Sequence, residues 1–274
     1  LLSLRGIETN KFNKMISNKA SQTKSINLDL NSIRFKLDLK ELSLFLETRN
    51  TKVNYKNVSL PIKNLKVYID FLSLLKSDPK IKKADISLEE LNIVQLNKLS
   101  SLIKPSNFKS VLNNKIKRGK LISEIEIFFT EEGTFKDFIA RGKVLQLEAE
   151  LLSGLTFQKG NLNFIADTND ILLKNIFGNL ENVKISEGDI KLNLENGIKL
   201  SSNFNSKIDY DKNNFVALGK VLKKNEILEN IYSVSANLSN NISIDFDSTY
   251  KIQNYSYSIL GNLEKGEFQF PKNI

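Results

Sequence analysis

The sequence of 274 residues contains no cysteine, no histidine and no tryptophan, and it has only one methionine and four prolines. Without cysteine there are no disulfides, thiolate zinc sites, cysteine-ligated iron–sulfur clusters or cysteine nucleophiles. Without histidine there is no Ser-His-Asp triad, no HExxH zinc site and no side chain whose unperturbed pKa lies near neutrality. The remaining chemistry rests on carboxylates, Lys, Tyr and Ser/Thr. We therefore expect a protein that is not an enzyme and that holds no cofactor and no metal.

Basic residues are in excess, but few of them are arginine. Lys and Arg number 40 against 31 Asp and Glu, a formal net charge of +9, and arginine occurs only at Arg5, Arg34, Arg49, Arg118 and Arg141. Nucleic-acid readers favour the arginine fork, whereas Lys with abundant Asn and Ile is typical of AT-rich codon usage. The densest basic cluster, Lys115 to Lys120, has no interleaved aromatics. We interpret it as a solvated helix end and expect no nucleic-acid partner.

Apolar runs are short. None approaches the roughly 18–20 residues that span a bilayer, and Leu1–Leu4 is too short for the apolar part of a signal peptide. The chain starts at Leu1 rather than at Met. We expect any membrane anchor to lie upstream of residue 1.

Alternation of apolar and polar residues is the dominant pattern. After an expected short amphipathic helix at 9–20, capped by Thr9, apolar residues recur at every second position from Ile26 to Leu46. The phase slips at Asn31-Ser32 and at Lys40-Glu41, which predicts hairpin turns or bulges that keep the apolar set on one side. A further strand enters through Pro61. This period of two predicts antiparallel strands with one wet and one apolar face.

Two helices and a change in glycine usage divide the chain. Helical spacing predicts helices over 92–103 and 107–116, the second ended by Gly119. No glycine occurs between Gly6 and Gly119, whereas glycines afterwards recur between apolar runs and are expected to punctuate strands. We predict an N-terminal unit with short helices at 1–118 and continuing antiparallel strands at 119–274.

The predicted fold is mostly β with a few short helices. An elongated, curved antiparallel sheet with one apolar face would form an open groove, and a closed β-sandwich would bury the same residues in a core. Composition leaves both open. Paired carboxylates Glu89-Glu90 and Glu131-Glu132 do not converge on a strand, so they indicate no acid/base site. Asp245 and Asp247 lack the loop of a calcium site. Irregular spacing of the runs argues against a parallel β-helix.

Several segments resemble one protein family. These are Gly6 to Asn13 before the expected helix, the alternating block at 26–46, Val58-Ser-Leu-Pro-Ile62, and Ile86-Ser-Leu-Glu-Glu-Leu-Asn-Ile93 before a Leu-rich helix. The chain resembles the N-terminal part of the periplasmic region of AsmA-like proteins of Gram-negative bacteria, including YhdP- and TamB-like relatives. The later Gly-led strands, such as Gly142-Lys-Val144 and Gly188-Asp-Ile190, are similar to the groove repeats of that family.

The resemblance implies a repeating β-groove, or β-taco, in the periplasm with an inner-membrane anchor. It implies a phospholipid partner, envelope protein partners, and a role in lipid transport between inner and outer membranes or in outer-membrane assembly. The alternative is a structural or protein-interaction domain of the cell envelope without lipid cargo. The residues expected to line the groove are Ile26, Leu28, Leu30, Ile33, Phe35, Leu37, Leu39, Leu42, Leu44, Leu46, Leu65, Val67, Ile69, Phe71, Val144, Leu147, Leu162 and Phe164.

Overall fold

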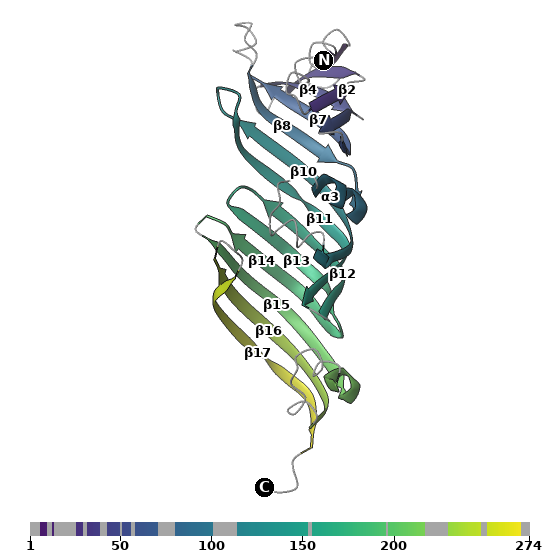
Figure 1. The fold of residues 1–274 in the computed structure, drawn as a ribbon, viewed down its shortest axis with the longest axis vertical. Helices are drawn as coiled ribbons and strands as arrows, with labels where there is room; N and C mark the ends of the chain where they lie inside the picture. Colours follow the sequence, from purple (N-terminus) through teal and green to yellow (C-terminus); the bar gives the residue numbers. More distant parts are fainter. Residues whose placement is uncertain are drawn as a thin grey trace. The chain divides into compact units, whose positions relative to one another are not determined.

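The computed structural model of the protein describes residues 6–9, 13, 26–29, 32–38, 43–49, 51–55, 58–70, 80–100, 114–152, 155–195, 197–216, 230–247 and 251–269 (Figure 1). Strands dominate these residues, as the period of two predicts. The N-terminal elements are β1 (Ile7–Thr9), β2 (Ile26–Asp29), β3 (Ile33–Asp38), β4 (Ser43–Arg49), β5 (Lys52–Tyr55), β6 (Val58–Leu60), β7 (Ile62–Ile69), β8 (Ile81–Leu88), β9 (Leu91–Asn92) and α3 (Ile93–Ser100).

Longer strands follow in the second half of the chain. They are β10 (Ile116–Phe129), β11 (Phe135–Leu152), β12 (Leu155–Ala166), β13 (Asp170–Leu180), β14 (Val183–Asn193), β15 (Ile198–Asp211), β16 (Ile231–Phe246) and β17 (Ile252–Phe268). A short helical turn follows β15 at 212–216.

One antiparallel sheet holds most of these strands. Its order is β1-β3-β4-β7-β8-β10-β11-β12-β13-β14-β15-β16-β17, with β9 paired to β10, so that β1 and β17 stand at its two ends. The only other sheet among the described strands is the short β2-β5-β6. The prediction of a mostly β, antiparallel, open sheet is confirmed. The large second sheet that a closed sandwich requires is not present among the described strands.

The chain divides into two compact units. Unit 1 comprises Leu1–Lys104, Leu121–Gly142 and Ala166–Thr168, and unit 2 comprises Pro105–Lys120, Lys143–Ile165 and Asn169–Ile274. Strands β10 and β11 contribute residues to both units, and β12 belongs to unit 2 except for its last residue, Ala166. Each unit is described below on its own.

In unit 1 the alternation places every second side chain on one face. Leu46 on β4 lies between Phe35 on β3 and Val67 on β7, and Val67 lies opposite Ala84 on β8. The predicted slip at Lys40-Glu41 coincides with a hairpin, because Asp38 pairs with Ser43. Pro61 stands directly before β7, as its missing N–H predicts.

Unit 2 corrects for extra residues with bulges. Gln146, Lys159, Asn175 and Glu187 all adopt positive φ of 53° or 54°. In β13 the pairing jumps from Leu173 to Ile176 with Asn175 as the extra residue, and in β14 it shifts near Glu187. Asn175 stands one position before Ile176. The bulge there therefore keeps Leu173 and Ile176, three positions apart, on the same face.

The prediction that the later glycines lie between strands is right for some of them and wrong for others. Gly160, Gly178 and Gly188 lie inside β12, β13 and β14, whereas Gly133 and Gly197 occupy turns with positive φ. A side chain on Gly160 or Gly178 would overlap the ring of Phe157. Gly160 and Gly178 leave room for the ring of Phe157, which stands three residues before Gly160 in β12 and on the strand next to that of Gly178.

The helix predictions have mixed outcomes. Helix α3 confirms the 92–103 prediction over its described part, and Asn92 and Gln95 exchange two backbone-to-side-chain hydrogen bonds at its start. The predicted 107–116 helix is wrong at its end, because Ile116 is the first residue of β10. Gly119 therefore lies within a strand and does not end a helix. Thr9 is the last residue of β1, and Asn13, the one described residue within 10–20, is helical, as the predicted 9–20 helix requires.

Candidate functional site

The apolar face of unit 1 brings together eight of the predicted residues. Leu37 lies opposite Leu44, which lies opposite Ile69, and Phe35, Leu46 and Val67 form the next row. Ile33 is 2% exposed, whereas the others are half-buried. The residues of this face are Ile33, Phe35, Leu37, Leu44, Leu46, Leu65, Val67 and Ile69.

Two predicted residues lie in the short sheet, and four lie outside the described residues. Ile26 and Leu28 lie in β2, which pairs with β5 in the short sheet and not with β3. The slip at Asn31-Ser32 therefore marks a change of sheet. Leu30, Leu39, Leu42 and Phe71 lie outside the described residues.

Unit 2 gathers the four remaining predicted residues. Phe157, Leu162 and Ile176 form a buried cluster, and Val144, Leu147 and Phe164 pack against it. Gln146, whose φ is 53°, stands between Val144 and Leu147, and these two side chains, three positions apart, reach the same cluster.

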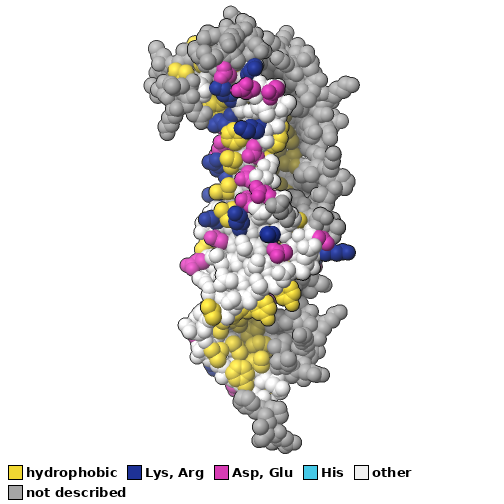
Figure 2. Space-filling view, turned by 90° about the vertical axis from the view of Figure 1, so that its left-hand side faces the viewer, with side chains coloured by type: hydrophobic (Ala, Val, Ile, Leu, Met, Phe, Trp, Pro, Cys, Tyr) yellow, Lys and Arg dark blue, Asp and Glu magenta, His cyan; other side chains and the backbone are white. Residues whose placement is uncertain are grey.

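The apolar face of β15, β16 and β17 was missed by the sequence analysis. Its rows include Leu200, Ile244 and Tyr255, and then Ser202, Ile242 and Tyr257. On β17 these side chains are open to solvent: Tyr257 is 69% exposed and Ile259 is 53% exposed. Figure 2 shows hydrophobic side chains gathered over the lower part of that view, at the level of β16 and β17 in Figure 1. The alternation of Tyr255, Tyr257 and Ile259 with serines is the sequence signal from which this face could have been predicted.

A shallow hollow of about 450 Å³ lies on this face. Its lining is almost wholly apolar and comes from Asn240, Ile242, Ile244, Ile252, Tyr255, Ser256, Tyr257 and Ile259. Contiguous exposed apolar surface of this kind marks binding sites more often than inert surface.

The opposite face of the same strands is polar and largely uncharged. Ser243 pairs with Ser201 on one side and Ser256 on the other, and Asn241 pairs with Asn203 and Ser258. Strands β15–β17 of unit 2 are therefore amphipathic. The polar groups of one face can form hydrogen bonds with water, whereas the side chains of the apolar face cannot.

In unit 1 the face opposite the apolar one carries charge. Glu47 is 5% exposed and binds Lys36, with 2.8 Å between Oε2 and Nζ. Arg141 binds Glu126 at 2.6 Å. Phe45 and Tyr68 pack with ring centroids 5.3 Å apart, and the Lys83 ammonium lies 4.4 Å from the Tyr68 centroid. Charged side chains show over the upper part of the view in Figure 2.

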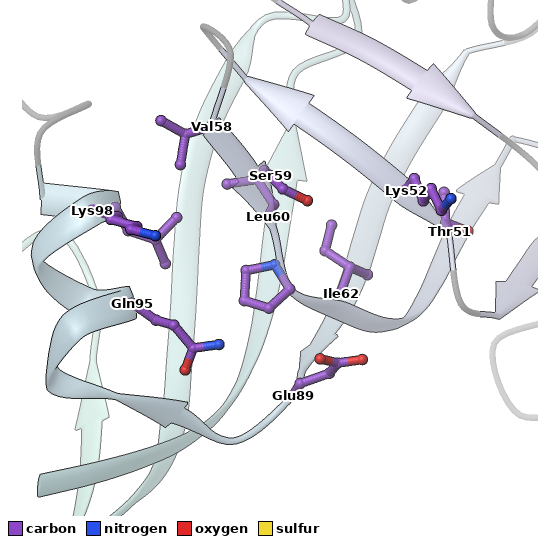
Figure 3. Close-up of a pocket in the computed structure, with 11 residues that line it drawn as sticks. Thr51, Lys52, Val58, Ser59, Leu60, Ile62, Glu89, Gln95 and Lys98 are labelled. Carbon is purple, nitrogen blue, oxygen red and sulfur yellow. The ribbon is translucent and has the colours of Figure 1, made fainter.

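A pocket of about 780 Å³ lies in unit 1 between the short sheet and α3 (Figure 3). Its apolar walls include Leu60, Pro61 and Ile62, and its polar lining includes Lys52, Glu89, Gln95 and Lys98. The Glu89 amide donates to the Pro61 carbonyl at 2.9 Å, which ties β7 to the end of β8. The pocket has the chemistry to hold a small amphiphilic group.

Only the start of the basic cluster lies at a helix end. Lys115 is helical, whereas Lys117, Arg118 and Lys120 lie in β10, which begins at Ile116. Lys115 binds Glu150 at 3.2 Å, and Arg118 lies 3.6 Å from Glu148. Carboxylates of β11 thus offset part of this charge.

No cluster of three metal-ligating side chains occurs within the described ranges. Glu89-Glu90 and Glu131-Glu132 lie between strands and are exposed. None of the helices in the described part of the chain is long and apolar enough to cross a bilayer.

No family model, curated protein or solved structure matches this chain. The function below therefore rests on the surface just described and on the resemblance drawn from the sequence.

Proposed function

We propose that the chain is a non-enzymatic lipid-binding module that holds phospholipid acyl chains against the apolar face of its sheet. The observation that carries the proposal is the exposed apolar face of β16 and β17, with Tyr257 and Ile259 more than half exposed. Covering such surface with hydrocarbon contributes about 0.8 kcal/mol for each buried CH₂. The polar face behind it stays in water.

The cellular role follows the resemblance to AsmA-like proteins. In that role the chain lies in the periplasm of a Gram-negative cell, anchored to the inner membrane, and moves phospholipid toward the outer membrane or assists outer-membrane assembly. Binding breaks no bond, so the proposal requires no catalytic residue, cofactor or metal.

Lipid binding is tested by displacement of a fluorescent phospholipid from the purified chain, with extraction and mass spectrometry of what co-purifies. Ile259→Asp places a carboxylate on the apolar face at a position that is 53% exposed, so the fold survives and binding weakens at least tenfold. Ser258→Asp is the matched control, because Ser258 pairs with Asn241 on the polar face. Equal loss of binding in both variants, or no lipid bound by the wild type, overturns the proposal.

A second function, protein interaction in the cell envelope, is favoured by the position of β17. This strand has only β16 as a described neighbour, and Leu260 on its polar-side face is 69% exposed. An edge strand with exposed apolar residues is a template for strand addition. Binding of lipid with no protein captured at β17 favours the first function.

A further inference from the structure

One polar side chain interrupts the apolar face of β16. Asn240 stands between Leu238 and Ile242 on that face, opposite Phe204 on β15 and Ile259 on β17. It is only 7% exposed. An amide at such a position is costly unless its polar atoms are bonded, so its partners identify its role.

The amide nitrogen of Asn240 is fully occupied. Nδ2 lies 2.9 Å from Ser206 Oγ, and 3.2 Å from the carbonyl oxygen of Phe204. It also lies 3.4 Å from the carbonyl oxygen of Leu238. Carbonyl oxygens accept and never donate, so these contacts fix which end of the amide is nitrogen.

The amide oxygen is left without a donor among the described residues. The side-chain hydrogen bonds of Asn240 to described residues all run through Nδ2, and two of them hold that nitrogen toward β15. Asn240 also lines the 450 Å³ hollow, whose other walls are almost wholly apolar. Asn240 is the one amide side chain in this lining, beside the hydroxyl-bearing Tyr255, Ser256 and Tyr257.

We propose that this hollow selects apolar chains that carry a hydrogen-bond donor, namely hydroxylated acyl chains, over plain ones. The inference rests on the proposed lipid-binding function and adds the chemical class of chain. A plain chain that covers Asn240 strips water from Oδ1 and returns no partner, whereas a hydroxyl group donates to it. Sites with a buried polar group discriminate against ligands that leave that group unpaired.

The test compares stearate with 12-hydroxystearate, below micelle-forming concentrations, as competitors of a fluorescent fatty acid on the full chain. The hollow is open to solvent at Tyr257 and Ile259, so a chain slides until its hydroxyl meets Asn240. We expect the wild type to bind 12-hydroxystearate about tenfold more tightly than stearate. Asn240→Leu removes the acceptor, so that variant binds stearate at least as tightly and loses the preference.

Asn241→Leu is the matched control, because Asn241 lies on the polar face opposite Asn203 and Ser258. It keeps the preference of the wild type. Equal affinity of the wild type for the two chains overturns the inference and leaves lipid binding intact, and this comparison needs no variant to fold. A preference that persists in Asn240→Leu also overturns it. Failure of both chains to displace the probe overturns the proposed function itself.

Discussion

The ring of Phe157 on β12 lies against Gly178 on β13, so closely that a methyl group built on that glycine would be 2.7 Å from the ring atom Cε2. Phe157 is buried at the centre of the unit 2 cluster. The ring therefore has no free space to move into, and the glycine is required by packing rather than by a turn.

Gly178→Ala is expected to destabilise the protein by about 1–3 kcal/mol, because it overpacks this contact. Urea unfolding followed by circular dichroism measures the change. Gly119→Ala is the control, since its new methyl group would meet Leu147 at an ordinary 3.6 Å. There we expect no loss, or a small gain from the stiffer unfolded chain. Phe157→Leu should relieve most of the cost of Gly178→Ala, and additive effects of the two changes would contradict the contact.

The ion pair between Lys36 and Glu47 gives a second prediction. Lys36→Met removes the ammonium that lies 2.8 Å from the carboxylate of Glu47, whose side chain is 6% exposed. Removal of one partner from a buried pair costs about 3 kcal/mol. Arg34→Met breaks the exposed pair with Glu8 on the neighbouring strand and should cost less than about 1 kcal/mol. Similar unfolding midpoints for the two variants would show that Lys36 does not compensate a buried charge.

Tyr210 gives a prediction about alkaline pH. Burial raises the pKa of its phenol above the ordinary value of 10.0, and the nearby charge of Glu181 raises it further. The folded state therefore holds this proton more tightly than the unfolded state. Its contribution to stability is complete below pH 10 and is lost as the pH rises through the folded-state pKa.

The measurement is the urea midpoint between pH 9 and pH 11, together with phenolate absorbance. Tyr210→Phe should flatten the alkaline fall in stability and remove one late-titrating phenol. The new side chain still packs edge-on against Phe215, whose ring centroid lies 5.3 Å from that of Tyr210. An unchanged pH profile in Tyr210→Phe would exclude this tyrosine as the source.

The edge at β17 gives a fourth prediction. Leu260 pairs with Ser239 on the polar side of the sheet and is exposed. Leu260→Lys adds a charge to an edge strand, a change that discourages pairing of edges. We expect less self-association in analytical ultracentrifugation and unchanged lipid binding. A loss of lipid binding in this variant would show that lipid contacts the polar side of the sheet, which contradicts the proposal.

The sequence was enough to predict the strands of unit 1 and their shared face. Phe35, Leu46 and Val67 meet because alternation alone decides which side of a strand a residue occupies. The role of Gly178 was not predictable, because it depends on an aromatic ring that another strand supplies. The role of the Asn240 amide was not predictable for a similar reason, because its nitrogen is bound by Ser206, which lies on another strand, β15. Nor does periodicity tell whether Ile26 and Ile33 share a sheet, since β2 and β3 carry the same pattern.

The bulges of unit 2 determine where the chain tolerates a change in length. Deleting one residue from a regular strand turns every later side chain to the opposite face until the next hairpin. Deleting Asn175 instead removes the extra residue between Leu173 and Ile176, and both still point into the cluster. The same holds at Glu187, which lies in the register shift of β14 between Ser186 and Asp189. Single-codon deletions are therefore compatible with folding at these two sites, and related chains of different length should differ there first.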